Sequence, residues 1–161
     1  MKTDVYTEQP RVEFKHKVYG EFAFTEFGKA STVYTYTTSK SVSDKGAMND
    51  YVLAPPVIKS SHQDFNRDGL NERWNITMRV RKPFENAALS GATVILGFDY
   101  STSSLIKMNM ETLAIVNIAN VLVSSTTSAK KIKTIGTLEL KQESPLREIR
   151  GGRNLYNDNL F

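Results

Sequence analysis

The sequence contains no cysteine, and its only histidines are His16 and His62. The absence of thiols excludes a disulfide framework, a cysteine nucleophile and a thiolate zinc site. His16 alternates with Phe14 and Val18, so we expect it on the buried face of a strand, as a core residue rather than a base or a ligand. No H-x-x-E, G-x-S-x-G or P-loop pattern is present, so the sequence offers no nucleophile or phosphate cradle. These absences favour a non-enzymatic protein.

Long apolar runs are missing as well. No run approaches the roughly 20 residues that span a bilayer, and residues 1–10 lack the apolar centre of a signal peptide. Cysteine usage does not decide the compartment, because secretion neither requires nor forbids a disulfide. Two interpretations stay open: a cytosolic protein, or a domain whose membrane segments lie outside this chain.

Charge is not massed in any one place. The net charge of +4 comes from Lys and Arg residues scattered along the chain, and only residues 129–133 are locally basic. We interpret that stretch as the solvated start of a strand, and expect no nucleic-acid partner. A length of 161 residues with 40% hydrophobic and 24% charged residues is typical of one soluble globular domain, which we expect to cover residues 1–161.

The dominant pattern is the alternation of apolar and polar residues that marks half-buried strands. No convincing long helix interrupts it, and residues 40–50 read as a loop. Strands are expected over residues 10–18, 21–27, 31–39, 51–60, 73–81, 92–102, 107–125 and 131–142. The segment 92–102, apolar on both faces, is predicted to be central. The sequence therefore predicts an all-β fold, an antiparallel β-sandwich of jelly-roll or immunoglobulin-like type with little helix.

A short acidic loop, "DFNRDGLNE", stands between two of these strands. Oxygen-bearing residues occupy the first, third, fifth, seventh and ninth positions of a calcium loop, namely Asp64, Asn66, Asp68, Leu70 through its carbonyl, and Glu72. Position twelve is Asn75 rather than glutamate and a strand follows, so this is not an EF-hand. It is similar to the nine-residue loops between strands of extracellular β-proteins, which hold a structural Ca²⁺. The alternative is an empty polar turn, with local hydrogen bonds and Gly69 at positive φ.

The triplet Asn75-Ile76-Thr77 is an N-glycosylation acceptor on the solvent phase of its strand. Such triplets are common, so this one acquires meaning only if the domain is extracellular or lumenal. Four carboxylates, Glu8, Glu13, Glu26 and Asp99, could meet by folding, as glycosidase carboxylates do, but their spacing does not place them.

Several fragments together resemble a known family. They are "YTEQPRVEFKHKV" (6–18), "DFNRDGLNERWNITM" (64–78), "ATVILGFDYS" (92–101) and "GTLELKQESPL" (136–146), followed by Gly151-Gly152 and Tyr156-Asn157. In this order they resemble the lumenal domain of the transmembrane protein 231 family. The most specific pieces are the residues from Tyr6 to Val18 and the acidic loop.

The resemblance implies a membrane component of the ciliary transition zone, with this domain on the extracellular or lumenal side. Members of the family carry two transmembrane helices around that domain, and both are absent here, so we expect a fragment of the ectodomain. They belong to the Meckel syndrome (B9) complex, whose tectonics, meckelin and B9-domain proteins are the implied partners. The resemblance assigns no catalytic residue.

The main hypothesis is thus a non-enzymatic domain that binds other ectodomains. The alternative is a calcium-stabilised carbohydrate-binding or adhesive β-sandwich, which a row of exposed aromatics near Tyr34, Tyr36 or Tyr51 would favour. An enzyme is the third hypothesis, and it requires two carboxylates facing each other in a cleft.

Overall fold

The computed structural model describes residues 8–26, 28–39, 51–103, 107–119 and 131–138. The regular secondary structure of these residues consists of six strands: β1 (Arg11–Thr25), β2 (Thr32–Thr37), β3 (Val57–Gln63), β4 (Arg73–Arg79), β5 (Ala88–Thr102) and β6 (Met108–Ile118). All the strand pairs are antiparallel. The predicted all-β antiparallel fold is confirmed. Within the described ranges no helix has the length and apolarity to cross a membrane.

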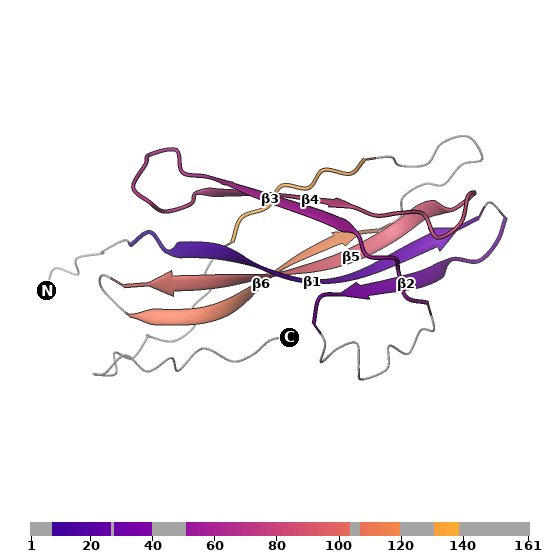
Figure 1. Ribbon diagram of the computed structural model, residues 1–161, viewed down its shortest axis with the longest axis horizontal. Helices are drawn as coiled ribbons and strands as arrows, with labels where there is room; N and C mark the ends of the chain where they lie inside the picture. Colours follow the sequence, from indigo (N-terminus) through magenta and orange to yellow (C-terminus); the bar gives the residue numbers. More distant parts are fainter. Residues whose placement is uncertain (1–7, 27, 40–50, 104–106, 120–130, 139–161) are drawn as a thin grey trace, which may run out of the picture.

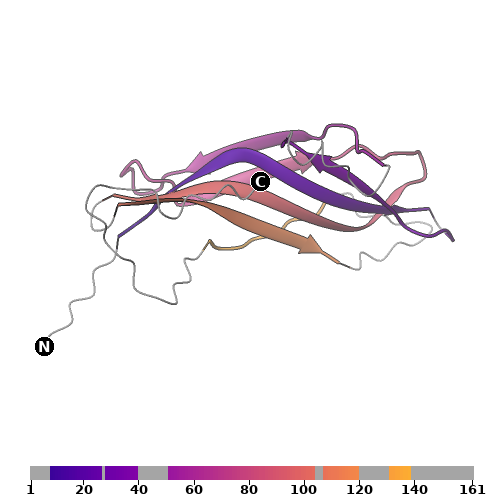
Figure 2. The ribbon, with the colours of Figure 1, turned by 90° about the horizontal axis from the view of Figure 1, so that it is seen from below.

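A four-stranded sheet in the order β2-β1-β5-β6 forms one layer, and the β3–β4 hairpin forms a second. The hairpin lies over one face of the larger sheet (Figure 1). Seen from below, the long strands β1, β5 and β6 twist along the length of the molecule (Figure 2). β5 pairs with β1 on one side and β6 on the other, so the prediction that residues 92–102 are central is confirmed.

β1 is one continuous strand of 15 residues, where the sequence predicted two segments separated at Gly20. Gly20 stays in the ladder, opposite Val94 on β5 and Tyr36 on β2. A Cβ on Gly20 would lie 2.6 Å from the Cε2 atom of Phe22. Glycine is therefore required here to make room for the ring of a core phenylalanine, and it does not end the strand.

His16 is a correction to the sequence interpretation. Between Phe14 and Val18, β1 advances four residues while β5 advances only two, from Phe98 to Leu96, which marks a β-bulge. His16 sits in this bulge with φ of 57° and is exposed. Strict alternation predicted a buried side chain, but the bulge breaks the alternation and turns His16 outward.

The core lies between the two layers. Phe14, Val18 and Phe98 are buried on the larger sheet, and the hairpin residues packed against them are Ile58, Trp74, Ile76 and Met78. The Trp74 indole Nε1 donates to the backbone oxygen of Val12 at 3.1 Å. Trp74, Ile76 and Met78 thus face the core, in agreement with the solvent phase predicted for Asn75 between them, and the two sheets stack as a sandwich.

Two predicted segments turn out differently. Residues 131–138 have no regular secondary structure and are all exposed, so the strand predicted for 131–142 is wrong over its described part. Residues 139–142, the predicted loop 40–50 and the end of the predicted strand at 120–125 lie outside the described residues.

The strand predicted at 51–60 begins only at Val57, after Pro55 and Pro56, because proline cannot donate to a ladder.

The stacking of the hairpin predicts a large effect of substitution at Trp74. Trp74→Ala should lower the free energy of unfolding by about 3 kcal/mol, because it removes apolar contacts with the larger sheet and leaves the Val12 carbonyl without its donor. The matched control is Phe65→Ala, at a residue that is 61% exposed. It should cost less than about 0.5 kcal/mol. Urea unfolding measures both, and equal effects would contradict the observed packing.

Candidate functional site

The acidic loop connects β3 to β4 at one end of the sandwich, where β5 ends and β1 and β6 begin (Figure 1). The hairpin ladder closes with the pair Gln63 and Arg73, and the Glu72 amide then donates to the Gln63 oxygen at 3.1 Å. This closure fixes the two ends of the loop side by side. Asp64 and Glu72, which flank the ladder, are thereby held near each other.

The backbone of the loop curls through two left-handed residues. Arg67 has φ of 60° and Gly69 has φ of 87°, and the positive φ predicted for Gly69 is confirmed. The curl aims backbone amides at the Asp64 carboxylate. Its Oδ1 accepts from the Arg67 amide at 2.6 Å and its Oδ2 accepts from the Gly69 amide at 2.9 Å.

Asn66, Asp68 and Leu70 form a second set of local bonds. The Asn66 side-chain oxygen Oδ1 accepts from the Asp68 backbone amide at 3.0 Å, while the Asn66 Nδ2 donates to Asp68 Oδ2 at 2.8 Å. The Leu70 amide donates to Asp68 Oδ1 at 2.8 Å. The predicted role of Leu70 as a ligand, through its carbonyl oxygen, stays a prediction, and so does that of Asn66.

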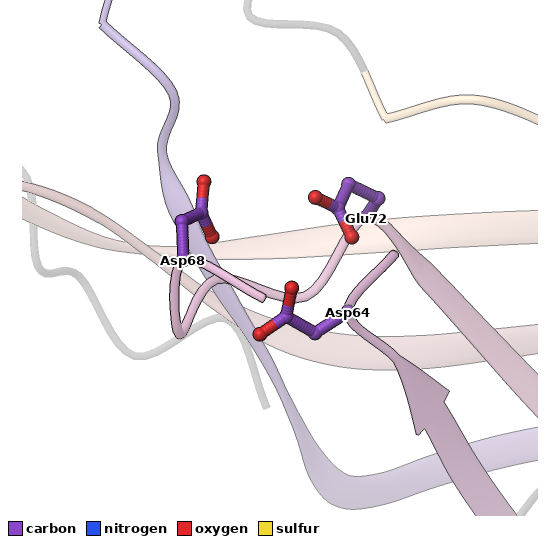
Figure 3. Close-up of side chains that lie close together, drawn as sticks. All are labelled: Asp64, Asp68 and Glu72. Atoms are coloured by element: carbon purple, nitrogen blue, oxygen red, sulfur yellow. The ribbon is translucent and has the colours of Figure 1, made fainter. Parts of the chain in front are cut away.

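Three of the predicted ligand side chains converge. Asp64, Asp68 and Glu72 each offer a carboxylate oxygen, and these oxygens lie within 4.8 Å of one another (Figure 3). Oxygens that share one Ca²⁺ at about 2.3–2.6 Å lie at most about 5 Å apart, so the cluster has the right size. Asp68 and Glu72 are exposed and Asp64 is half-buried, which leaves the cluster accessible to solvent.

The local hydrogen bonds and a bound cation are compatible. A carboxylate has about four lone-pair sites. Asp64 uses two of them on amides, and Glu72 uses one, since its Oε2 accepts from the Phe65 amide at 2.7 Å. The carboxylates of the turn therefore accept hydrogen bonds from nearby backbone amides and still have lone pairs that could bind a cation. The observed geometry is therefore compatible with both hypotheses from the sequence, the empty polar turn and the metal loop.

Asn75 lies near the loop on β4, where its side chain is exposed opposite Ser61. Thr77 is exposed on the same face, while Ile76 between them packs against the core. The acceptor triplet therefore stands on the outer face of the hairpin, as the alternation predicted.

The four-stranded sheet carries a row of carboxylates that the sequence predicted only in part. Glu13, Asp99 and Glu111 occupy directly opposed positions on β1, β5 and β6. The β1 bulge provides two cations for this row: Lys15 pairs with Asp99, and Lys17 pairs with Glu111 at 2.7 Å. Hydrogen bonding to Asp99 and its charge raise the pKa of Lys15. The sequence predicts that Glu13 and Asp99 could meet, and the register of β1 and β5 places them opposite each other.

These carboxylates do not form the cleft that an enzyme of this type requires. Glu13 is bound by Arg11 at 2.5 Å, so each acid of the row has a cation beside it. The shallow depression on the outer face of this sheet is lined by one acid, Glu21. Glu21 accepts from the Tyr19 hydroxyl at 2.6 Å, which raises the pKa of Tyr19 to about 12. The arrangement is that of structural ion pairs and hydrogen bonds.

The aromatic row that would favour carbohydrate binding does not form at the expected residues. Tyr34 and Tyr36 are half-buried and pack against the core clusters. Tyr51 is 52% exposed, and its ring lies 5.4 Å from that of Tyr34. One exposed ring at the margin of the sheet is not a flat platform for a sugar.

Comparison with curated proteins and comparison with solved structures gave no match. A protein-family model gave one, and it extends over the whole of residues 1–161. The match includes the strand-flanked acidic loop and the long first strand, the pieces on which the resemblance in the sequence depended. The family is described as Transmembrane protein 231, and the chain belongs to it.

Proposed function

We propose that this chain is a non-enzymatic interaction domain of a membrane protein of the ciliary transition zone. The family match over residues 1–161 carries the proposal. In it, the domain stands on the extracellular or lumenal side and binds the ectodomains of other members of the Meckel (B9) complex, the tectonics and meckelin first among them. Membrane helices outside this chain hold it at the transition zone, where the complex regulates which membrane proteins enter the cilium.

The architecture supports a binding role. A twisted sandwich with one small and one larger sheet presents two outer faces, several strand edges and a structured loop at one end. The acids Glu13, Asp99 and Glu111 are engaged in ion pairs, and the carboxylates of the acidic loop accept local hydrogen bonds. The surface is thus organised for recognition by shape, strand edges and polar contacts.

The acidic loop has its own proposed role, as a structural Ca²⁺ site. The convergence of Asp64, Asp68 and Glu72 supports it. Three carboxylates close together repel one another, and a divalent cation would cancel that repulsion and fix the turn. The ion would hold the end of the hairpin, and it would take no part in a reaction.

Asn75 is proposed as a glycosylation site of the same extracellular face. Its exposure on β4 supports this assignment. A glycan there would cover part of the outer face of the hairpin, so we place partner binding on other surfaces.

Proximity labelling of the full-length protein in ciliated cells tests the proposed function. A labelling enzyme fused on the side of this domain should biotinylate tectonics and meckelin at the transition zone. The control replaces this domain by an unrelated β-sandwich between the same membrane helices. Equal labelling by both proteins would contradict a partner-binding role for the domain.

Calcium binding is tested by isothermal titration. The chain should bind Ca²⁺, and Asp64→Asn, Asp68→Asn and Glu72→Gln should each weaken binding, because each removes one anionic ligand. Calcium should raise the melting temperature of the wild-type chain by mass action. Glu85→Gln, a change at an exposed acid outside the loop, should leave binding unchanged. If the wild-type chain has the same melting temperature with calcium and with a chelator, the proposed Ca²⁺ site is wrong.

Glycosylation is tested by expression through the secretory pathway. A glycosidase-sensitive increase in mass is expected, and Asn75→Gln should remove it. Thr77→Ser should keep the glycan and Thr77→Ala should lose it, because the acceptor needs a hydroxyl at this position. A wild-type chain of unmodified mass would count against the assignment.

A further inference from the structure

The strand edges of the two sheets are protected unequally. β2 is covered at Thr35, whose amide donates to the Tyr51 oxygen at 3.1 Å and whose oxygen accepts from the Leu53 amide at 2.8 Å. β3 follows two prolines and carries Lys59. β4 carries Arg73 and Arg79. A covering segment, prolines and charged side chains are the usual devices that prevent a strand edge from pairing with another chain.

β6 lacks the prolines and the basic side chains that are found at the edges formed by β3 and β4. It is an 11-residue strand at the edge of the larger sheet, and no strand of the described residues pairs with its outer side. Its register with β5 runs without a shift from Ala92 opposite Ile118 to Thr102 opposite Met108, so no bulge twists the edge away. It contains no Lys, Arg or Pro, and its one charge, Glu111, is buried and paired with Lys17.

An exposed apolar side chain marks the middle of this strand. Ile115 is 66% exposed on the outer face of the sheet. Its neighbour Ala114 points to the other face, where it packs against the cluster of Phe14, Val18 and Phe98. A long, regular edge with an exposed isoleucine at its centre has the features of an unprotected pairing surface.

We propose that β6 is a homodimerisation site, at which two copies of the chain pair antiparallel and join their sheets edge to edge. The twofold axis of such a dimer is perpendicular to the sheet, so it maps each face onto itself. Opposed residues must therefore lie on the same face, and the permitted registers differ by steps of two residues.

The side-chain pattern of β6 selects one register, centred on Ala114. On the outer face this register places Leu113 opposite Ile115 of the second copy and Glu111 opposite its Asn117. On the inner face it places Thr112 opposite Val116 and Met110 opposite Ile118. Apolar residues thus meet mainly apolar ones, the carboxylate meets an amide, and no like charges oppose.

The neighbouring registers are less complementary. Centring on Leu113 would place Ile115 opposite the Glu111 carboxylate, and centring on Ile115 would place Leu113 opposite Asn117. Each would bury an apolar group against a polar one. The strand is self-complementary in one register, which favours a second copy of this chain over an unrelated strand as the occupant.

The first experiment measures the association of the 161-residue chain by analytical ultracentrifugation across about a hundredfold range of concentration. The wild-type chain should form a dimer as concentration rises. Ile115→Lys should weaken the dimer at least about tenfold, because it places an edge lysine in both copies. Ile135→Lys is the matched control at a residue that is 83% exposed outside β6, and it should dimerise like the wild type.

Thermal melting of the monomeric samples separates association from folding, and both variants should melt like the wild type because both side chains are exposed. A wild-type chain that stays monomeric at every concentration would overturn the proposal. So would an Ile115→Lys chain that dimerises as strongly as Ile135→Lys. Neither result bears on the ciliary role, which proximity labelling tests independently.

The second experiment tests the register. Since the chain has no cysteine, any disulfide formed by a single-cysteine variant joins two chains. Ala114→Cys should cross-link rapidly under mild oxidation, because residues opposed in an antiparallel pair have Cα atoms about 4.5–5.5 Å apart, within the range of a disulfide. Ser61→Cys, exposed on the hairpin, is the control. If Ala114→Cys cross-links no faster than the control, the register with its twofold axis at Ala114 is wrong.

Discussion

The structure depends on the packing of the β3–β4 hairpin against β1 and β5. The contact centres on the buried rings of Phe14 and Phe98, and on Trp74, which adds a hydrogen bond to the Val12 carbonyl. An isolated two-stranded hairpin is at best marginally stable in water, so burial of its inner face holds this one in place. That burial leaves the outer face of the hairpin, with Asn75, in solvent and carries the acidic loop to one end of the molecule.

Hydrogen bonds from its own backbone organise the acidic loop without an ion. Left-handed residues at Arg67 and Gly69 point amides at Asp64, and the Phe65 amide donates to Glu72. These bonds offset part of the repulsion among the carboxylates and hold them at a spacing that suits a hard cation. A loop of this kind would lose little conformational entropy on binding Ca²⁺, because most of its geometry is already fixed.

Much of this fold follows from local patterns. Alternation located the strand that begins at Arg73, and apolar composition identified residues 92–102 as central. Spacing alone marked Asp64, Asp68 and Glu72, because all three belong to one turn. Three of the wrong predictions have one cause. The outward turn of His16, the continuation of β1 through Gly20 and the irregular backbone of residues 131–138 each depend on a neighbouring element, and alternation along one segment does not record that neighbour.

The sequence by itself determined the β-class, the acidic turn and the exposed phase of Asn75, because strand periodicity and turn geometry act over a few residues. Only the tertiary structure decided which groups from distant segments meet. The β1 bulge and the register of three strands brought Glu13, Asp99 and Glu111 into one row beside Lys15 and Lys17. The order of strands in the sheet placed β6 at an edge and left Ile115 exposed, because pairing order depends on the packing of the whole chain.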